Sequence, residues 1–216
     1  MNNTSLLSTF GSNSIERVEQ AIKDMKKGKG VLVVDNEDRE NEGDIIYAAE
    51  TMTRDQMAFM VRECSGIVCL CITKQIAEQF KLPMMVEHNT SVYGTAFTIS
   101  VDAAKGVTTG VSASDRIKAI KVVLNKDGKP EDFVQPGHTF PLVAKDGGVL
   151  ERDGHTEASV DLARLAGFAP VGVLCELCAP DGEMAKLPRV CAFAQLHDMT
   201  VCSVEDIKAY RIAKGL

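Results

Sequence analysis

The hydrophobic pattern of the chain switches repeatedly between the spacing of helices and the spacing of strands. Apolar residues three or four positions apart, with Ser or Thr near the start and Gly near the end, predict helices. Short apolar runs rich in β-branched residues, and one stretch of strict alternation, predict strands. Helices are expected to begin near Ser14, Thr53, Thr73, Ser114, Thr156, Arg189 and Ser203, and strands to cover 31–34, 45–48, 66–72, 97–101, 140–143, 148–150 and 171–177.

Helical and strand segments alternate along the whole chain, which is typical of a layered α/β fold. We expect an α/β three-layer sandwich, with one sheet and helices on both of its faces. The pair Asp146-Gly147 lies between two short expected strands and predicts a hairpin, so the sheet is expected to be mixed, with parallel and antiparallel pairs. No linker rich in Pro, Ser or like charges interrupts the pattern. Residues 1–216 are therefore expected to form a single domain.

Composition narrows the class of protein. The 216 residues include 24 basic and 30 acidic side chains, a formal charge of −6. No apolar stretch approaches the roughly 20 residues of a membrane span, and residues 1–13 do not resemble a signal peptide. An acidic chain with no Trp and no run of Lys or Arg is poorly suited to nucleic acid. We expect a soluble cytoplasmic protein that acts on a small molecule and binds neither nucleic acid nor membranes.

The seven cysteines also indicate a reducing compartment. Their number is odd, and most of them lie in apolar runs such as 67–72. Secreted proteins of this size usually carry paired cysteines, whereas buried cysteine behaves as a small hydrophobic residue. We therefore expect seven free thiols.

The segment 35–44 is the first candidate for chemistry. It contains six carboxylates in ten residues, together with Arg39 and Gly43, and directly follows an apolar strand. Acidic segments are often solvated loops, and that interpretation stays open. However, α/β proteins build sites at the ends of strands, and clustered carboxylates suit a hard divalent cation such as Mg²⁺. The segment thus predicts a metal site.

The segment 152–157 is the second candidate. Arg152 can form paired hydrogen bonds with a phosphate, Gly154 allows close approach of the backbone, and Thr156 is expected to cap the following helix. A helix N-terminus also attracts anions. The segment predicts an anion site, although a capped turn with an exposed Arg would look the same.

Two of the four histidines share one sequence context. Gly-His-Thr occurs at His138 and again at His155. Histidine near carboxylates can bind metal or move protons near neutral pH. The other two, His88 and His197, lack such neighbours and are expected to be surface or core residues.

A zinc deaminase is the alternative enzyme class. Such enzymes use an H-x-E motif and a later P-C-x-x-C, and the chain has His155 and Glu157 followed by Cys175 and Cys178. Leu174 stands where the motif has Pro, and residues three apart on a strand face opposite sides. A third class, a metal-independent binding protein, would require both candidate segments to be accidental.

Several longer motifs closely resemble one enzyme family. They are DRENEGD at 38–44, SGIVC at 65–69, GVTTGVSA at 106–113 followed by Asp115 and Arg116, PGH at 136–138, GHTEA at 154–158 and GVLCE at 172–176. In this order they resemble the 3,4-dihydroxy-2-butanone 4-phosphate synthases of riboflavin biosynthesis, over essentially the whole chain.

The resemblance implies an activity and an assembly. Enzymes of this family are Mg²⁺-dependent lyases that convert D-ribulose 5-phosphate into L-3,4-dihydroxy-2-butanone 4-phosphate and formate. They are homodimers with a mixed three-layer sheet, and their sites lie near the dimer interface. We expect Mn²⁺ to substitute for Mg²⁺, and a sugar phosphate to be the small-molecule partner.

The resemblance also implies residue roles. The metal would be held by Glu40 and His155. The substrate would be held by Arg39, Glu40, Asp44, Arg152, Asp153, Gly154, His155, Thr156 and Glu176. The acid–base groups would be His138, Glu176, Asp44 and Cys69. For Cys69 the alternative, a core residue that packs like Cys71, stays open.

Overall fold

The computed structural model describes residues 6–216, in which seven strands form one mixed sheet. The strands are β1 Val31–Val34, β2 Gly43–Ala48, β3 Cys69–Ile72, β4 Val101–Ala103, β5 Phe133–Val143, β6 Gly172–Glu176 and β7 Thr200–Ser203. Their order across the sheet is β4-β5-β3-β6-β2-β1-β7. The β1–β7 and β3–β5 pairs are parallel, and the other pairs are antiparallel.

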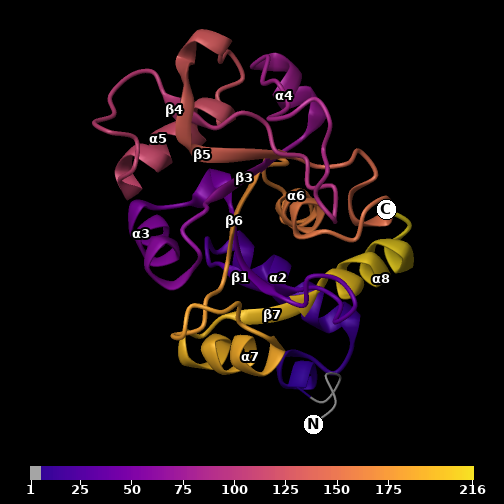
Figure 1. The fold of residues 1–216 in the computed structure, drawn as a ribbon. Coiled ribbons are helices and arrows are strands. Elements are labelled where there is room, and N and C mark those ends of the chain that lie inside the picture. The colour runs from indigo at the N-terminus through magenta and orange to yellow at the C-terminus, as the bar shows by residue number, and fades with distance from the viewer. Residues whose placement is uncertain (1–5) are drawn as a thin grey trace.

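Helices cover both faces of the sheet. They are α2 Ser14–Lys26, α3 Arg54–Glu63, α4 Lys74–Gln79, α5 Ala113–Leu124, α6 His155–Leu165, α7 Leu187–Leu196 and α8 Val204–Lys214, with short 3-10 helices at Ser8–Phe10, Ala49–Thr51, Pro130–Asp132 and Gly148–Leu150. Figure 1 shows α6 and α8 on one side of the central strands, and α3 and α7 on the other. The expected three-layer α/β sandwich with a mixed sheet is confirmed.

Each face of the sheet has its own buried core. Along β1, Val31 and Val33 pack with α2, α6 and α8, whereas Leu32 and Val34 pack with α3, α5 and α7. Side chains alternate between the two faces of a strand, so a strand covered on both faces is apolar at every position. This explains the unbroken apolar run at 31–34.

Local capping chemistry sets several helix ends. Capping boxes are present at two of the expected helix starts: Thr53 with Gln56 begins α3, and Ser203 with Asp206 begins α8. The cap of α6 differs from the prediction, because the helix begins one residue earlier and Gly154, rather than Thr156, is its N-cap residue.

The expected hairpin at Asp146-Gly147 is wrong. Residues Gly148–Leu150 form a 3-10 helix, and the Val149 amide donates to the buried Asp161 carboxylate at 2.9 Å instead of to a neighbouring strand. This contact ties the segment to α6. The sheet is mixed for another reason, since β2 runs antiparallel to both β1 and β6.

Two strands also differ in extent. The alternation at 97–101 gives isolated bridges at Phe97 and Thr98, and regular pairing begins only at Val101. In the other direction, β5 extends back to Phe133 through Pro136 and Gly137, residues that weaken a strand signal. Among the described helices, none is long and apolar enough to span a membrane.

Candidate functional site

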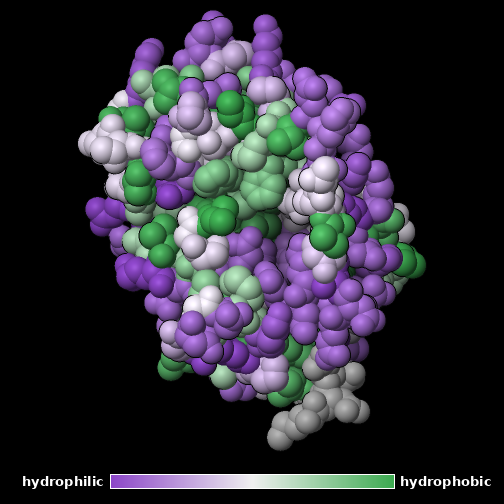
Figure 2. Space-filling model, in the orientation of Figure 1, coloured by the Kyte–Doolittle hydropathy of each residue, from purple (hydrophilic) through white to green (hydrophobic). Residues whose placement is uncertain are grey.

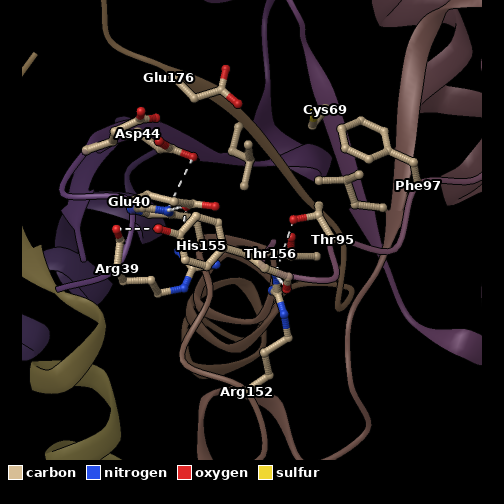
Figure 3. Close-up of a pocket in the computed structure, with 14 residues that line it drawn as sticks. Arg39, Glu40, Asp44, Cys69, Thr95, Phe97, Arg152, His155, Thr156 and Glu176 are labelled. Atoms are coloured by element: carbon tan, nitrogen blue, oxygen red, sulfur yellow. Dashed lines mark hydrogen bonds and ion pairs between the residues drawn. The ribbon is translucent and has the colours of Figure 1, made fainter. Parts of the chain in front are cut away.

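One cavity gathers most of the expected site residues. It has a volume of about 250 Å³ and lies where β1 and β6 end, β2 begins and α6 starts. Figure 3 shows side chains from the segment 39–44, from β3 Cys69, from the end of β6 and from the start of α6 converging on it. The expected residues that line it are Arg39, Glu40, Asp44, Cys69, Arg152, His155, Thr156 and Glu176.

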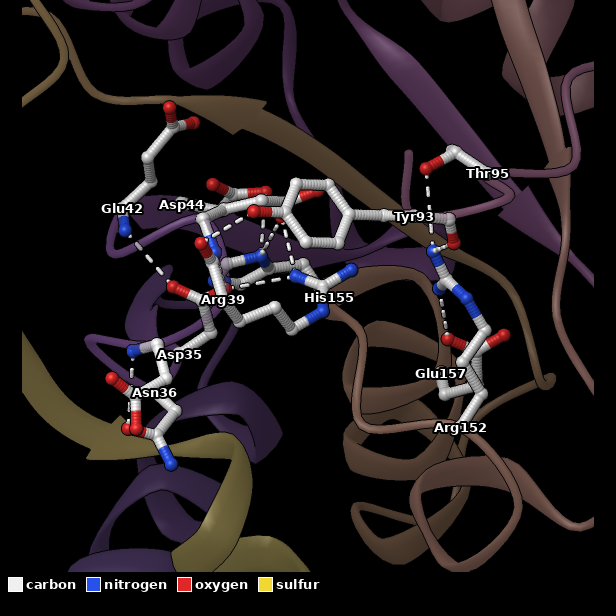
Figure 4. A network of polar contacts seen from close by, with 12 residues as sticks. Asp35, Asn36, Arg39, Glu42, Asp44, Tyr93, Thr95, Arg152, His155 and Glu157 are labelled. Carbon is white, nitrogen blue, oxygen red and sulfur yellow. Dashed lines mark hydrogen bonds and ion pairs between the residues drawn. The ribbon is translucent and has the colours of Figure 1, made fainter. Parts of the chain in front are cut away.

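The acidic segment is a folded loop rather than a solvated tail. The buried Asp35 carboxylate accepts the Glu40 amide at 3.0 Å, the Glu42 amide at 2.9 Å and the Arg39 guanidinium at 2.8 Å. Asn41 takes a left-handed conformation with φ 53°, which Asn tolerates better than most residues. Asp35 therefore organises the loop (Figure 4), and Glu40 of this loop lines the cavity (Figure 3).

Asp35, Glu40 and His155 form a donor set suited to a cation. Their donor atoms lie within 4.8 Å of one another. His155 Nδ1 is 3.3 Å from Glu40 Oε2 and 3.9 Å from Asp44 Oδ2. Within the described part of the chain, the buried atoms His155 Nε2 and Asp44 Oδ1 have no hydrogen-bond partner. Buried polar atoms normally have partners, so the residues present fit a metal with its bound waters.

The electrostatics of this set favour positive charge. Burial lowers the pKa of His155, but the charge of Asp44 and the hydrogen bond to Glu40 outweigh burial and raise this pKa to about 9. Burial raises the pKa of Glu40, yet His155 and Arg39 bring it down to about 2. Burial also holds the pKa of Asp44 well above its usual range. A field that stabilises an imidazolium in a buried place would stabilise a metal ion for the same reason.

Arg152 lies just before α6 and is fixed by three partners. Its guanidinium donates to the buried Glu157 carboxylate at 2.6 Å, to the Tyr93 carbonyl at 3.1 Å and to the Thr95 hydroxyl at 3.2 Å. A side chain at Gly154 would collide with this guanidinium and displace it, so glycine at this position leaves room for it. The arrangement places a cation next to the free amides of the helix N-terminus, as the anion-site hypothesis requires.

Asp153 lies outside the cavity. Its carboxylate instead pairs with Lys208 of α8 at 2.9 Å. Gly154, the N-cap residue of α6, likewise does not line the cavity.

Glu176 and Cys69 face the cavity from neighbouring strands. Glu176 ends β6, and Ser65 donates to its carboxylate at 2.6 Å. The Cys69 thiol donates to the Ile67 carbonyl at 3.4 Å. Burial, and then the charge of Glu176, raise the pKa of Cys69 well above its usual range, so it is a neutral thiol. Cys71 packs on the same face of β3 but does not line the cavity.

His138 is not brought to this cavity. It lies on β5, its side chain is 46% exposed, and its ring bonds to Asp102 of β4 with 2.7 Å between Nδ1 and Oδ2. The two Gly-His-Thr motifs thus serve different places in one chain: His155 enters the cavity and His138 lies outside it.

Several cavity residues were missed by sequence reasoning. The Tyr93 hydroxyl donates to the Arg39 carbonyl at 2.6 Å, and its ring lies 5.0 Å from the Arg39 guanidinium. Thr95 and Phe97 line the same wall. Tyr93 and Thr95 lie in a segment with no periodic pattern and no charge cluster, and Phe97 was interpreted only as the start of the expected strand 97–101, so nothing in the sequence marked them as site residues. Asp35 was visible at the end of a strand but was not chosen as a ligand.

The zinc set of the deaminase alternative is not assembled. Within residues 6–216, the cluster of metal-ligating side chains that includes His155 contains Asp35 and Glu40, not cysteine. Cys175 instead lies 3.4 Å from the Ser65 hydroxyl, and Cys178 pairs through its backbone with Met184.

Comparisons with known proteins agree on one family. The family profile described as 3,4-dihydroxy-2-butanone 4-phosphate synthase matches residues 19–210. The protein of that name from Shewanella pealeana is 60% identical over 209 residues, which cover 97% of this chain and 98% of that protein. The Vibrio cholerae protein of the same name is 58% identical over 212 residues, which cover 98% of this chain and 97% of that protein.

A solved structure agrees with the sequence relatives. The crystal structure of a 3,4-dihydroxy-2-butanone 4-phosphate synthase in complex with two magnesium ions superposes with a TM-score of 0.87 at 42% identity, covering 92% of this chain and 98% of that one. Fold, motif order and full-length similarity lead to the same conclusion. The chain belongs to the 3,4-dihydroxy-2-butanone 4-phosphate synthase family.

Proposed function

We propose that this chain is a Mg²⁺-dependent lyase of riboflavin biosynthesis that converts D-ribulose 5-phosphate into L-3,4-dihydroxy-2-butanone 4-phosphate and formate. The observation that carries the proposal is the donor set of Asp35, Glu40 and the buried His155, in a cavity that also contains Arg152. Such a cavity suits a substrate that has vicinal oxygens at one end and a phosphate at the other. Membership of the family supplies the reaction.

Glu40 and His155 would hold the metal, with Asp35 next to them. Oxygen donors suit Mg²⁺, and Mn²⁺ accepts the same carboxylate and imidazole ligands. A related enzyme crystallises with two magnesium ions. Bound metal would stabilise negative charge that develops on the substrate's oxygens.

The chain's own residues bind and orient the substrate. Arg152 and the free amides at the start of α6, near His155 and Thr156, would bind the phosphate. Arg39 and Asp44 lie across the cavity and would bind hydroxyl groups. Because the whole protein carries a net charge of −6, this local positive charge has to overcome a repulsive field at long range.

Proton transfer falls to carboxyl groups and a histidine. Glu176, held by Ser65, presents a carboxylate that can take a proton from the carbon next to the ketone. Asp44 has a raised pKa because it is buried, which suits a group that gives up a proton at neutral pH. Cys69 supplies a neutral S–H at the cavity wall, and His138 is assigned as a further acid–base group.

We also propose that residues 1–216 work as a single domain in the cytoplasm. The described residues share one sheet, with one core on each face. All seven cysteines are free thiols, six of them buried, which suits a reducing compartment.

A homodimer is proposed for a separate reason. Apolar side chains are exposed on the chain, among them Ile67, Met85, Val86, Val92 and Val134. Figure 2 shows apolar surface gathered beside a hollow near the centre of the face in view. Large exposed apolar patches mark interaction sites, and a second copy would cover this surface.

The activity is tested by following carbon atoms. Ribulose 5-phosphate labelled with ¹³C at C4 should give labelled formate with Mg²⁺ present, and label at C1 should appear as a methyl signal by NMR. EDTA should stop the reaction and added Mg²⁺ should restore it. Label from C1 in the formate would contradict the mechanism. Full activity after metal removal would contradict the metal site, and release of ammonia from a pyrimidine would support the deaminase instead.

A further inference from the structure

The His138 ring and backbone are both held by one buried carboxylate. Asp102 Oδ1 accepts the His138 amide at 3.0 Å, and Asp102 Oδ2 lies 2.7 Å from His138 Nδ1. Asp102 is only 6% exposed, whereas the His138 side chain is 46% exposed. The acid is thus fixed inside the protein, and the far edge of the imidazole is open to solvent or to a second molecule.

The surroundings keep Asp102 in place. The register of β4 and β5 shifts between Val101 and Asp102, so the two strands depart locally from regular pairing. A side chain at Gly137 would collide with the backbone at this point, and one at Gly110 would collide with the Asp102 carboxylate. Both glycines allow the chain to close over the carboxylate.

Two further charged groups face this pair from α5. The Arg116 guanidinium donates to the carbonyls of His138 and Val111. The Asp115 carboxylate accepts the Gly110 amide at 3.3 Å and so fixes the loop that covers Asp102. Within residues 6–216, His138 is therefore held at its amide, its carbonyl and its Nδ1, which leaves Nε2 for other partners.

The donor and acceptor inventory fixes the proton on the ring. An ionised carboxylate only accepts hydrogen bonds. Asp102 Oδ1 already accepts an amide, so Nδ1 has to donate to Oδ2 whether the ring is neutral or charged. In the neutral ring the lone pair is then on Nε2, the atom that a general base uses.

We propose that Asp102 is a positioning residue that holds His138 in the Nδ1–H tautomer and so presents Nε2 as a base. The proposal rests on the proposed function only in treating His138 as an acid–base group. The tautomer itself follows from the contacts of Asp102.

Asp102→Asn gives a sharp test because it keeps the size of the side chain. The amide oxygen of Asn can still accept the His138 amide, and its NH₂ group then faces Nδ1. Nδ1 has to become the acceptor, so the proton moves to Nε2 and the base is lost. General bases contribute about 10²- to 10⁴-fold. In Asp102→Asn we expect kcat to fall by about 100-fold or more, with little change in KM. Asp102→Glu, which keeps a carboxylate, should have a higher kcat than Asp102→Asn.

The tautomer is read by long-range ¹H–¹⁵N NMR of ¹⁵N-histidine-labelled protein, with His138→Ala used to assign the signal. The wild type should show a proton on Nδ1, and Asp102→Asn a proton on Nε2. Asp206→Asn is the matched control: it also removes a buried carboxylate, but from the ion pair with Arg17. It should lower the melting temperature and leave both kcat and the tautomer unchanged.

Several outcomes would overturn the proposal. They are a proton on Nε2 in the wild type, an unchanged kcat in Asp102→Asn, and a loss of kcat in Asp206→Asn equal to that in Asp102→Asn. A wild-type protein inactive on ribulose 5-phosphate would contradict the proposed function instead, and the NMR result would still decide whether Asp102 sets the tautomer.

Discussion

At the scale of single residues, one side chain of the site lowers the stability of the folded protein and another raises it. Asp44 is buried, carries a raised pKa and has an oxygen with no hydrogen-bond partner within residues 6–216. A buried carboxyl in this condition costs free energy in the folded state. Asp35 does the opposite, because its three hydrogen bonds hold the loop together. The segment 35–44 therefore combines Asp35, which stabilises its shape, with Asp44, whose burial costs free energy.

Glu40→Gln should separate metal binding from folding. We expect turnover to fall to background while the circular dichroism spectrum stays that of the wild type, because Asp35 still organises the loop. The wild type should gain thermal stability on addition of Mg²⁺, by about 2.7 kcal/mol at 100 times the dissociation constant. Glu40→Gln should lose this gain, whereas Glu42→Gln, in the same cavity but outside the donor set, should keep it. An equal gain in Glu40→Gln would contradict the assignment.

Arg152→Ala should weaken both substrate binding and folding. Loss of a charge-assisted hydrogen bond to phosphate costs about 1.5–3 kcal/mol, so KM should rise about 10- to 100-fold. The buried Glu157 would also lose its cation, at a cost of about 3 kcal/mol in unfolding free energy.

The double variant Arg152→Ala with Glu157→Gln distinguishes the two effects. It should recover stability in urea unfolding but not KM. If KM recovers together with stability, Arg152 is a structural residue and the phosphate binds elsewhere.

At the scale of elements, a buried ion pair joins the first and last long helices. Arg17 of α2 bonds to both oxygens of Asp206, the third residue of α8, at 2.6 and 2.7 Å. Burial raises the pKa of Asp206, but the hydrogen bonds from Arg17, Ser14 and Ser203 outweigh it and leave the pKa below its usual range. The pair thus fastens α8 to α2 on the face of the sheet that also carries α6.

The contribution of this ion pair to the free energy of unfolding depends on pH with a definite sign. A carboxyl whose pKa is lower in the folded state stabilises the protein above the pKa of the unfolded chain, about 3.9, and loses that contribution as pH falls through the folded value. Asp206→Asn should therefore cost about 3 kcal/mol at pH 6, and the gap to the wild type should shrink below about pH 4. Urea unfolding of both proteins at a series of pH values measures this gap in the free energy of unfolding. A gap that is constant from pH 3 to pH 7 would show that the charge of Asp206 contributes nothing.

Elements with local signals were predictable from sequence. The capping boxes at Thr53 and Ser203 lie within one helical turn, and the structure has both. The elements that were not predicted correctly depend on contacts between segments distant in sequence. The stretch after Gly147 bonds to Asp161 of α6 instead of pairing as a strand, and β7 is a four-residue strand recognisable only by its parallel pairing with β1.

The site residues divide in the same way, into those with a local sequence signal and those without one. Residues in compact motifs, such as Glu40 and His155, were found because several chemical groups are close in sequence, whereas Glu176 was expected only from the resemblance. Tyr93 and Asp102 were not found, because each acts through contacts with residues more than 30 positions away. A single tyrosine in a polar loop carries no such information until the fold brings it to Arg39.

At the scale of the whole molecule, the cavity and His138 raise a geometric question. The resemblance assigns His138 to catalysis, yet it does not line the cavity of its own chain. Its ring is half exposed and rigidly held by Asp102. In a two-fold dimer each copy offers the same surface to the other. If the proposed homodimer places His138 against the cavity of the second copy, the two chains would share each site.

Mixing inactive variants tests this arrangement. Glu40→Gln has a defective cavity but an intact His138, and His138→Ala the reverse, so each should be inactive alone. If the site is shared, an equal mixture exchanged through unfolding and refolding should recover about a quarter of wild-type activity, because half of the dimers are mixed and each has one complete site. Glu40→Gln mixed with His155→Ala should stay inactive, since both defects lie in the same cavity. Light scattering should show twice the chain mass throughout. Dimers without recovered activity in the first mixture would mean that each chain uses its own His138, and the ring would then have to move to reach the cavity.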